Sequence, residues 1–161
     1  FKVMAVSTQF IPNFIIAKLA HDYLTPYIIA QVVIYMDPKA AAKIGKSLRI
    51  DYMGQVALYA SPEITARIGN LMETNIVAQV VKDLAAKNFH SKLGELADLL
   101  EDRVMLEIIK VLRDGKIVGN IANSMVNEEK IVRIAQQMPP DIRSGAKAQL
   151  ESLGNKLSER F

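Results

Sequence analysis

AQVVIYMDP at residues 30–38 returns as GQVALYASP at residues 54–62, and AAKIGKSL at 41–48 returns as TARIGNLM at 65–72. Both copies lie 24 residues after their originals. Two consecutive matches at one offset indicate a repeat made of two short helices, which meet at the turn Asp37-Pro38 or Ser61-Pro62. The sequence therefore predicts an all-α fold, a right-handed α-solenoid of two-helix repeats of about 24–28 residues.

The pattern extends in both directions. The segment that follows Pro12 resembles the second helix of a repeat, so the array begins in mid-repeat. Toward the C-terminus the first-helix pattern recurs at 76–86, 105–114 and 129–140, and the second-helix pattern at 91–100 and 116–125, if four residues are inserted around Leu96 to Glu101. We expect one domain over 1–161, with a cap or linker at 1–11, repeats at 12–140, and a C-terminal cap and fraying tail at 141–161.

Aligning the repeats predicts the core. Two repeat positions are apolar throughout: Val32, Val56, Val80, Ile108 and Ile134 in one, and Met36, Ala60, Leu84, Leu112 and Met138 in the other. A third position holds Gly45, Gly69 and Gly94. Because glycine within a helix costs about 1 kcal/mol relative to alanine, we expect helix backbones to cross closely at these glycines, and a leucine there to be destabilising.

Composition excludes several classes of function. The chain has no cysteine, which rules out disulfides, thiolate metal sites and a cysteine nucleophile. A net charge of +3 without basic clusters argues against nucleic-acid binding. The longest uncharged runs are too short to span a membrane. We expect a cytoplasmic protein of bacterial type, without a cofactor.

Few residues suggest chemistry. His21 and His90 occupy non-equivalent repeat positions and have no nearby cysteine, so a structural role is the preferred interpretation. Glu95, Asp98, Glu101 and Asp102 form the densest acidic patch, which could bind a divalent cation such as magnesium weakly, although a solvated helix face is preferred. No arrangement typical of an enzyme is present, and we expect none.

Two polar rows are candidates for a partner surface. Gln31, Gln55 and Gln79 recur every 24 residues, and Tyr35 and Tyr59 recur at the same spacing. Equivalent positions of a solenoid line up along its surface, and tyrosine is enriched in interfaces. The alternative is that glutamine is only a good helix former on an exposed face.

A basic row is the second candidate surface. Lys18, Lys43, Arg67 and Lys92 are expected to point the same way, three of them with local acidic partners at Asp22, Glu63 and Glu95. The residues left without such a partner are Lys39, Lys43, Lys46 and Arg49. A solvated face is preferred, and any acidic partner is expected to dock here.

The open end of the array predicts self-association. Large apolar residues gather where no preceding repeat covers them: Phe10, Ile11, Phe14 and Ile15. Such a surface is expected to pair with another copy or with another protein.

The short paired helices, with second helices opening on DPKAAAKIGKSL and SPEITARIGNLM, resemble the N-terminal domain of MgtE-type magnesium transporters and the related helical domains of the FliG flagellar switch protein. The resemblance covers roughly Pro26 to Met138. It implies a cytosolic regulatory or sensing role, and it assigns no metal ligand to this chain.

We therefore expect a non-enzymatic protein-interaction or regulatory module that can form oligomers. The two alternatives are a cytosolic cation-sensing domain and a protein that associates with a membrane surface or lipid through its apolar N-terminal stretch.

Overall fold

The computed structural model describes residues 2 and 11–161. Within them the secondary structure is helical, with no strand, so the predicted all-α class is confirmed. The even-numbered helices are α2 (Asn13–Tyr23), α4 (Pro38–Gly45), α6 (Pro62–Gly69), α8 (His90–Leu99), α10 (Gly115–Ser124) and α12 (Pro140–Ser152). The odd-numbered helices are α3 (Pro26–Val33), α5 (Ile50–Tyr59), α7 (Thr74–Ala86), α9 (Asp102–Leu112) and α11 (Glu128–Ala135). A 3-10 helix, η2 (Lys156–Arg160), follows them.

The repeated turns begin helices in the expected way. The Asp37 carboxylate accepts a hydrogen bond from the Ala40 N–H at 3.0 Å, and the Ser61 hydroxyl accepts one from the Ile64 N–H at 3.4 Å. In both turns the next residue is proline, whose fixed φ suits the first helical position. The dipeptides that mark the sequence repeat are therefore helix N-caps.

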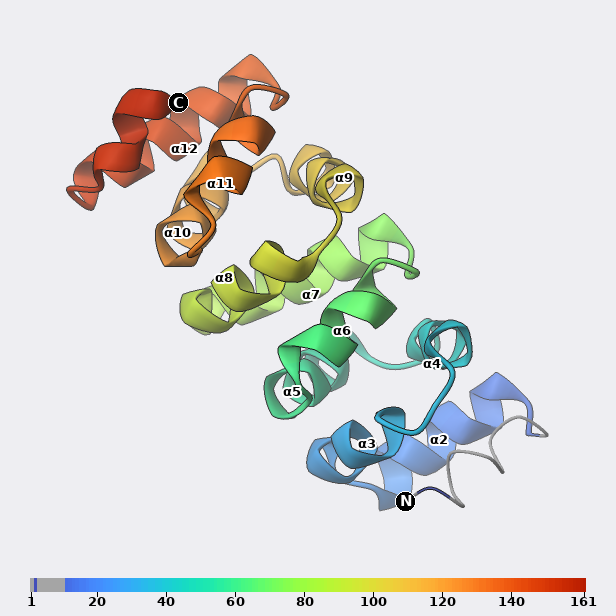
Figure 1. The fold of residues 1–161 in the computed structure, drawn as a ribbon. Coiled ribbons are helices and arrows are strands. Elements are labelled where there is room, and N and C mark those ends of the chain that lie inside the picture. Colours follow the sequence, from blue (N-terminus) through green and yellow to red (C-terminus); the bar gives the residue numbers. More distant parts are fainter. Residues whose placement is uncertain (1, 3–10) are drawn as a thin grey trace.

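Each helix packs against the helix two places further along the chain. The even helices contact one another in order from α2 to α12, and the odd helices do so from α3 to α11. We call these two sets the even row and the odd row (Figure 1). The two predicted apolar positions lie between neighbours: most of their residues are buried, and Val56, Val80 and Met36 are half-buried.

The predicted four-residue insertion is in a different place. Helix α8 begins 28 residues after α6, whereas α6 begins 24 after α4, and α9 follows α8 at the ordinary distance. The extra residues lengthen the end of α7 and form the turn 87–89, where Asn88 has a φ of 63°. They do not lie around Leu96 to Glu101. The α8 residue equivalent to Gly69 is consequently Ala97, not Gly94, and the residue equivalent to Arg67 is Glu95, not Lys92.

The expected close crossing at Gly45 and Gly69 is wrong. A Cβ at Gly45 would meet the side chains of Met72, at 3.1 Å, and Met53, at 3.8 Å, and one at Gly69 would meet the Leu100 side chain, at 3.3 Å. Backbones approach closely at Gly94, where a Cβ would lie 2.5 Å from the Ser124 carbonyl, and at Gly115, where it would lie 2.7 Å from the Gly145 Cα. The tight crossings are thus α8 with α10 and α10 with α12.

A side-chain contact recurs between the ninth residue counted from the start of an even helix and the N-cap of the helix three places on. In α4 and α6, which have eight residues each, this ninth residue is the C-cap. His21 Nε2 accepts from the Arg49 N–H at 3.1 Å, and Asn70 Oδ1 accepts from the Glu101 N–H at 3.0 Å. Asp98 accepts from the Asn127 N–H at 3.1 Å. Two further pairs are Lys46 with Glu73 at 2.6 Å and Asn123 with Asn155 at 2.8 Å. These five contacts, which we call the staples, link successive repeats although their residue types differ.

The tail beyond Gly154 is ordered, contrary to expectation. In η2 Leu157 and Ser158 are buried, and Arg160 pairs with Glu128 and Glu129 of α11 at 3.2 and 2.9 Å. Among the described residues no helix is long and apolar enough to cross a membrane.

Candidate functional site

The predicted glutamine and tyrosine rows lie on the odd row of helices, except that Tyr35 lies in the turn after α3. Gln55 and Gln79 are exposed, Gln31 is partly buried, and Tyr35 and Tyr59 are more than half exposed. The aromatic ring that packs on Tyr59 is Tyr27, edge to face at 5.7 Å. The structure therefore adds Tyr27 to this surface. Its signal in the sequence is weak because Tyr27 and Tyr59 occupy different repeat positions.

The predicted basic surface lies on and after α4, in the even row. Two of its four members have acidic partners: Lys46 contacts Glu73 at 2.6 Å, and Arg49 contacts Asp51 at 2.9 Å. The expectation that this segment lacks such partners is wrong for these two residues. Lys39 and Lys43 are exposed, and no ion pair is formed by either within the described part of the chain. Of the predicted local pairs, Lys92 with Glu95 is present at 3.6 Å.

Large apolar side chains are exposed along α2. Phe14 is 69% exposed and Tyr23 is 77% exposed. Within α2, Ile15, Leu19 and Tyr23 succeed one another at intervals of four residues, which places them along one side of the helix. Ile11 is also exposed and lies before the helix begins. Phe10, the remaining predicted member of this surface, lies outside the described residues.

One of the two histidines singled out in the sequence, His21, has structural partners, and so does Asp98 of the acidic patch. His21 is part of a staple and packs edge to face on Tyr52 at 4.7 Å, while the Tyr52 hydroxyl donates to the Ala20 and Leu24 carbonyls. Asp98 accepts two backbone N–H groups at the start of α11. The Asp98 carboxylate is therefore not only solvated, because it caps the start of α11. Among the residues that the structure describes, no group of His, Cys, Asp and Glu residues could hold a metal ion.

Asp102 joins α9 to α11. Its carboxylate accepts from Arg133 at 2.6 Å, and Lys130 Nζ lies 3.9 Å away. The hydrogen bond from Arg133 is the main cause that lowers the pKa of Asp102. Lys130 is buried, and its ammonium donates to the Asp98 and Leu100 carbonyls at the end of α8. Burial lowers the pKa of Lys130, and the nearby carboxylates oppose that effect.

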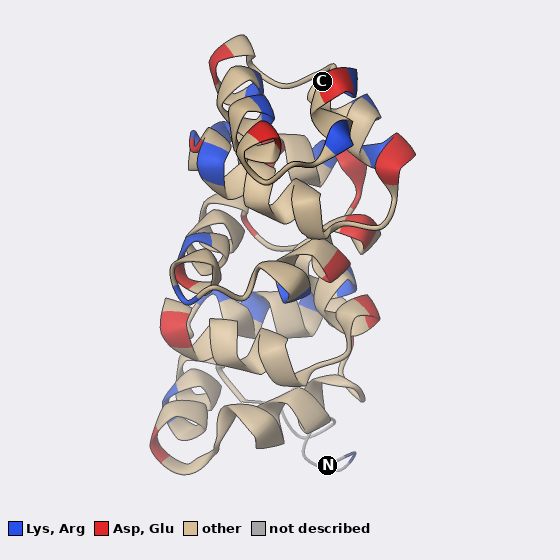
Figure 2. Ribbon diagram, turned by 90° about the vertical axis from the view of Figure 1, so that its left-hand side faces the viewer, with Lys and Arg blue, Asp and Glu red and all other residues tan. Residues whose placement is uncertain are grey.

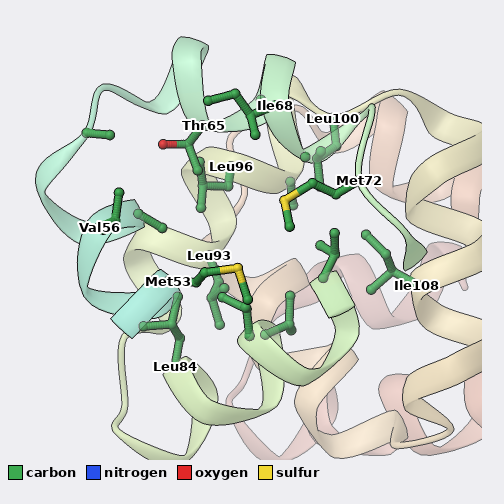
Figure 3. Close-up of a pocket in the computed structure, with 18 of the residues that line it drawn as sticks. Met53, Val56, Thr65, Ile68, Met72, Leu84, Leu93, Leu96, Leu100 and Ile108 are labelled. Atoms are coloured by element: carbon green, nitrogen blue, oxygen red, sulfur yellow. The ribbon is translucent and has the colours of Figure 1, made fainter. Parts of the chain in front are cut away.

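The sequence did not predict an apolar cavity of about 400 Å³ between the two rows. Figure 3 shows its middle part, where Met53 and Met72 extend into the space between the helices. Its lining runs from Ile11, before α2, to Met138, after α11. The alignment of repeats placed ten of the lining residues in the core but carried no information on how completely the two rows fill the space between them.

The lining is almost free of polar groups. Of the lining residues that the structure describes, Thr65 alone bears a hydroxyl, and its Oγ1 is buried without a hydrogen-bond partner among residues 11–161. The lining is exposed at the N-terminal end, where Ile11 is 37% and Leu19 is 44% exposed. At the other end Ile131 and Ile134 are 2% and 1% exposed, so the cavity is closed there.

Comparison of the chain with protein-family models, with curated proteins and with solved structures gives no match in any of the three.

Proposed function

We propose that the chain is a non-enzymatic helical-repeat interaction module, a right-handed α-solenoid whose N-terminal surface pairs with a second copy of itself. The observation that carries the proposal is the set of exposed apolar side chains on α2: Ile15, Leu19 and Tyr23 along one side of the helix, and Phe14 in its first turn. Contiguous exposed apolar surface on a protein is typical of an interaction site.

The distribution of charge supports this choice of surface. Within 11–36 the acidic and basic residues are Lys18 and Asp22 alone. In Figure 2 the Lys, Arg, Asp and Glu residues gather toward the C-terminal part, whereas the ribbon near the N-terminus is mostly uncharged. A surface with so little charge presents no strong repulsion to an identical surface, and a two-fold contact needs a patch that is complementary to itself.

Sedimentation equilibrium at high micromolar concentration tests the proposal. The triple variant Phe14→Ser, Ile15→Ser, Tyr23→Ser is expected to be monomeric where the wild-type chain is dimeric. None of these three residues lines the cavity, so the variant separates pairing from any ligand bound there.

Val126→Ser is the matched control, because Val126 is 87% exposed and lies in the turn between α10 and α11. This variant is expected to dimerise like the wild type. A wild-type monomer under these conditions, or a triple variant that still dimerises, would rule the proposal out.

A further inference from the structure

The apolar cavity between the two rows is separate from the repeat pattern and from the proposed pairing of two copies. Its lining residues come from α2 to α11 and the turns between them, so it extends along most of the described chain. Three kinds of occupant can be compared with the volume and the lining of the cavity: water, a peptide and an aliphatic chain.

Water is a poor occupant. A buried water molecule needs two to four polar partners, and the lining offers a single side-chain hydroxyl, on Thr65. The volume of about 400 Å³ would hold many molecules without such partners. The favoured occupant is therefore apolar.

A peptide also fits badly. A helix of ten residues is about 15 Å long and 10 Å across, which amounts to on the order of 1,000 Å³ and exceeds the cavity of about 400 Å³. An extended peptide would bring one N–H and one C=O per residue. The lining side chains offer almost nothing to pair with them.

The shape and the lining favour a flexible aliphatic chain. A volume of about 400 Å³ spread along so many helices leaves a long, narrow space. No aromatic residue lines it, whereas all six methionines of the described chain do: Met36, Met53, Met72, Met105, Met125 and Met138. Methionine is unbranched and adapts its shape to apolar ligands.

We propose that this cavity binds one unbranched hydrocarbon chain, such as the acyl chain of a fatty acid or of a membrane lipid. The hydrocarbon chain enters beside Ile11 and Leu19 of an unpaired copy, where the lining is exposed, and its polar end group stays in water there. Because the proposed pairing would cover these two residues, pairing and entry of the hydrocarbon chain compete for the same surface. The methyl end points toward the closed end at Ile131 and Ile134.

Binding of cis-parinaric acid, a straight-chain fatty acid that fluoresces in apolar surroundings, tests the proposal with the full chain. We expect saturable binding at one molecule per protein, with displacement by hexadecanoic acid and by hexadecanol but not by butanoic acid. Absence of saturable binding to the wild-type protein would overturn the proposal.

Two variants reduce the space in different ways. Gly69→Leu places a side chain in the lining, where the atom nearest to its Cβ is the flexible Leu100 Cδ2 at 3.3 Å. Val56→Phe enlarges a half-buried lining residue. Each is expected to weaken binding by about tenfold or more, since a pocket discriminates even single methylene groups by such factors.

Val111→Phe is the matched control, because Val111 is 39% exposed and lies outside the lining. It should bind like the wild type. Equal losses in Val56→Phe and Val111→Phe, or unchanged affinity in a folded Gly69→Leu protein, would show that the probe binds elsewhere and would overturn the proposal.

Two further arms separate the remaining occupants. Uptake of labelled phospholipid from phosphatidylcholine vesicles, lost in Gly69→Leu, would identify membrane lipid as the source, whereas uptake of free hexadecanoic acid alone would identify the free acid. Both outcomes support the proposal. If the fatty acid bound only after deletion of residues 1–10, the proposal would be overturned, because that result would mean that residues of the protein itself occupy the cavity.

Discussion

Thr65 carries a buried hydroxyl with no hydrogen-bond partner in an otherwise apolar lining. A buried unsatisfied polar group costs about 1–3 kcal/mol. Thr65→Val removes the hydroxyl and keeps the shape, so we expect it to stabilise the protein by about 1 kcal/mol or more. Urea unfolding measures the effect, and a lowered midpoint would mean that the hydroxyl has a partner.

The glycines of the even row differ in what surrounds them. Gly94→Ala would place a Cβ against the Ser124 backbone at 2.5 Å, which cannot move without moving α10. We expect a loss of about 1–3 kcal/mol, the range of overpacked cores. Gly69→Ala is the control, because its Cβ meets only a side-chain end and alanine favours the helix, so a gain of a few tenths of a kcal/mol is expected.

The decisive comparison is between the unfolding midpoints of the two variants. Equal unfolding midpoints for Gly94→Ala and Gly69→Ala would contradict the assignment of the tight crossing to α8 and α10.

The ion pair of Asp102 with Arg133 is expected to make the stability of the protein depend on pH. Its pKa in the folded protein lies below the ordinary value of 3.8, chiefly through the Arg133 hydrogen bond. The stabilisation is therefore present at pH values above 3.8 and is lost as pH falls through the lowered pKa. Because the Asp102 side chain is about one-third exposed, solvent screens the pair and the effect is modest.

The measurement compares Tm of the wild type with that of Arg133→Gln from about pH 6 to pH 2. We expect the wild-type advantage to shrink as pH falls. An advantage that is constant over this range would show that Asp102 is not the group involved.

At the scale of helices, the staples hold successive repeats together. Asp98, at the ninth position of α8, accepts from the Val126 and Asn127 N–H groups at 2.8 and 3.1 Å. Asp98→Ala would leave both donors without this acceptor at the start of α11. We expect a loss of about 1.5–3 kcal/mol, the range for hydrogen bonds to a charged group, measured by urea unfolding.

Glu95→Ala serves as the comparison, since Glu95 lies on the same helix, is exposed and makes only a long ion pair with Lys92. Its effect should remain within about 0.5 kcal/mol. A similar loss in both variants would mean that the acidic patch acts through general charge rather than through the staple.

At the scale of the whole molecule, α12 covers the C-terminal end of the stack. Ile142, Ala146 and Leu150 are at most 3% exposed and belong to the same cluster as Ile131 and Ile134. Deletion of residues 140–161 would uncover this cluster, because terminal repeats shield the core of a repeat array from water.

We expect the truncated chain to unfold at a lower urea concentration and to elute as larger species in size-exclusion chromatography. An unchanged midpoint with a monomeric profile would show that the preceding helices do not depend on α12.

The sequence alone determined the helical class, the helix starts and the residues between neighbouring helices. Each depends on local chemistry: Asp37-Pro38 and Ser61-Pro62 cap helices wherever they occur, and a 24-residue period brings Val32, Val56 and Val80 to equivalent positions. The position of the four-residue insertion was predicted wrongly because apolar helices can be aligned in several registers. Gly94 was aligned with Gly69 because both are glycine, although the residue equivalent to Gly69 is Ala97.

Only the tertiary structure decided the staples, the tight crossings and the cavity. A staple joins positions 27–32 residues apart through His, Lys, Asn or Asp, so no shared residue type marks it in the sequence. Gly45 and Gly94 differ in the atoms that face them from another helix, which is a matter of helix crossing geometry. The cavity exists because the apolar side chains of the two rows do not fill all the space between them, and the separation of packed elements is a property of the assembled fold.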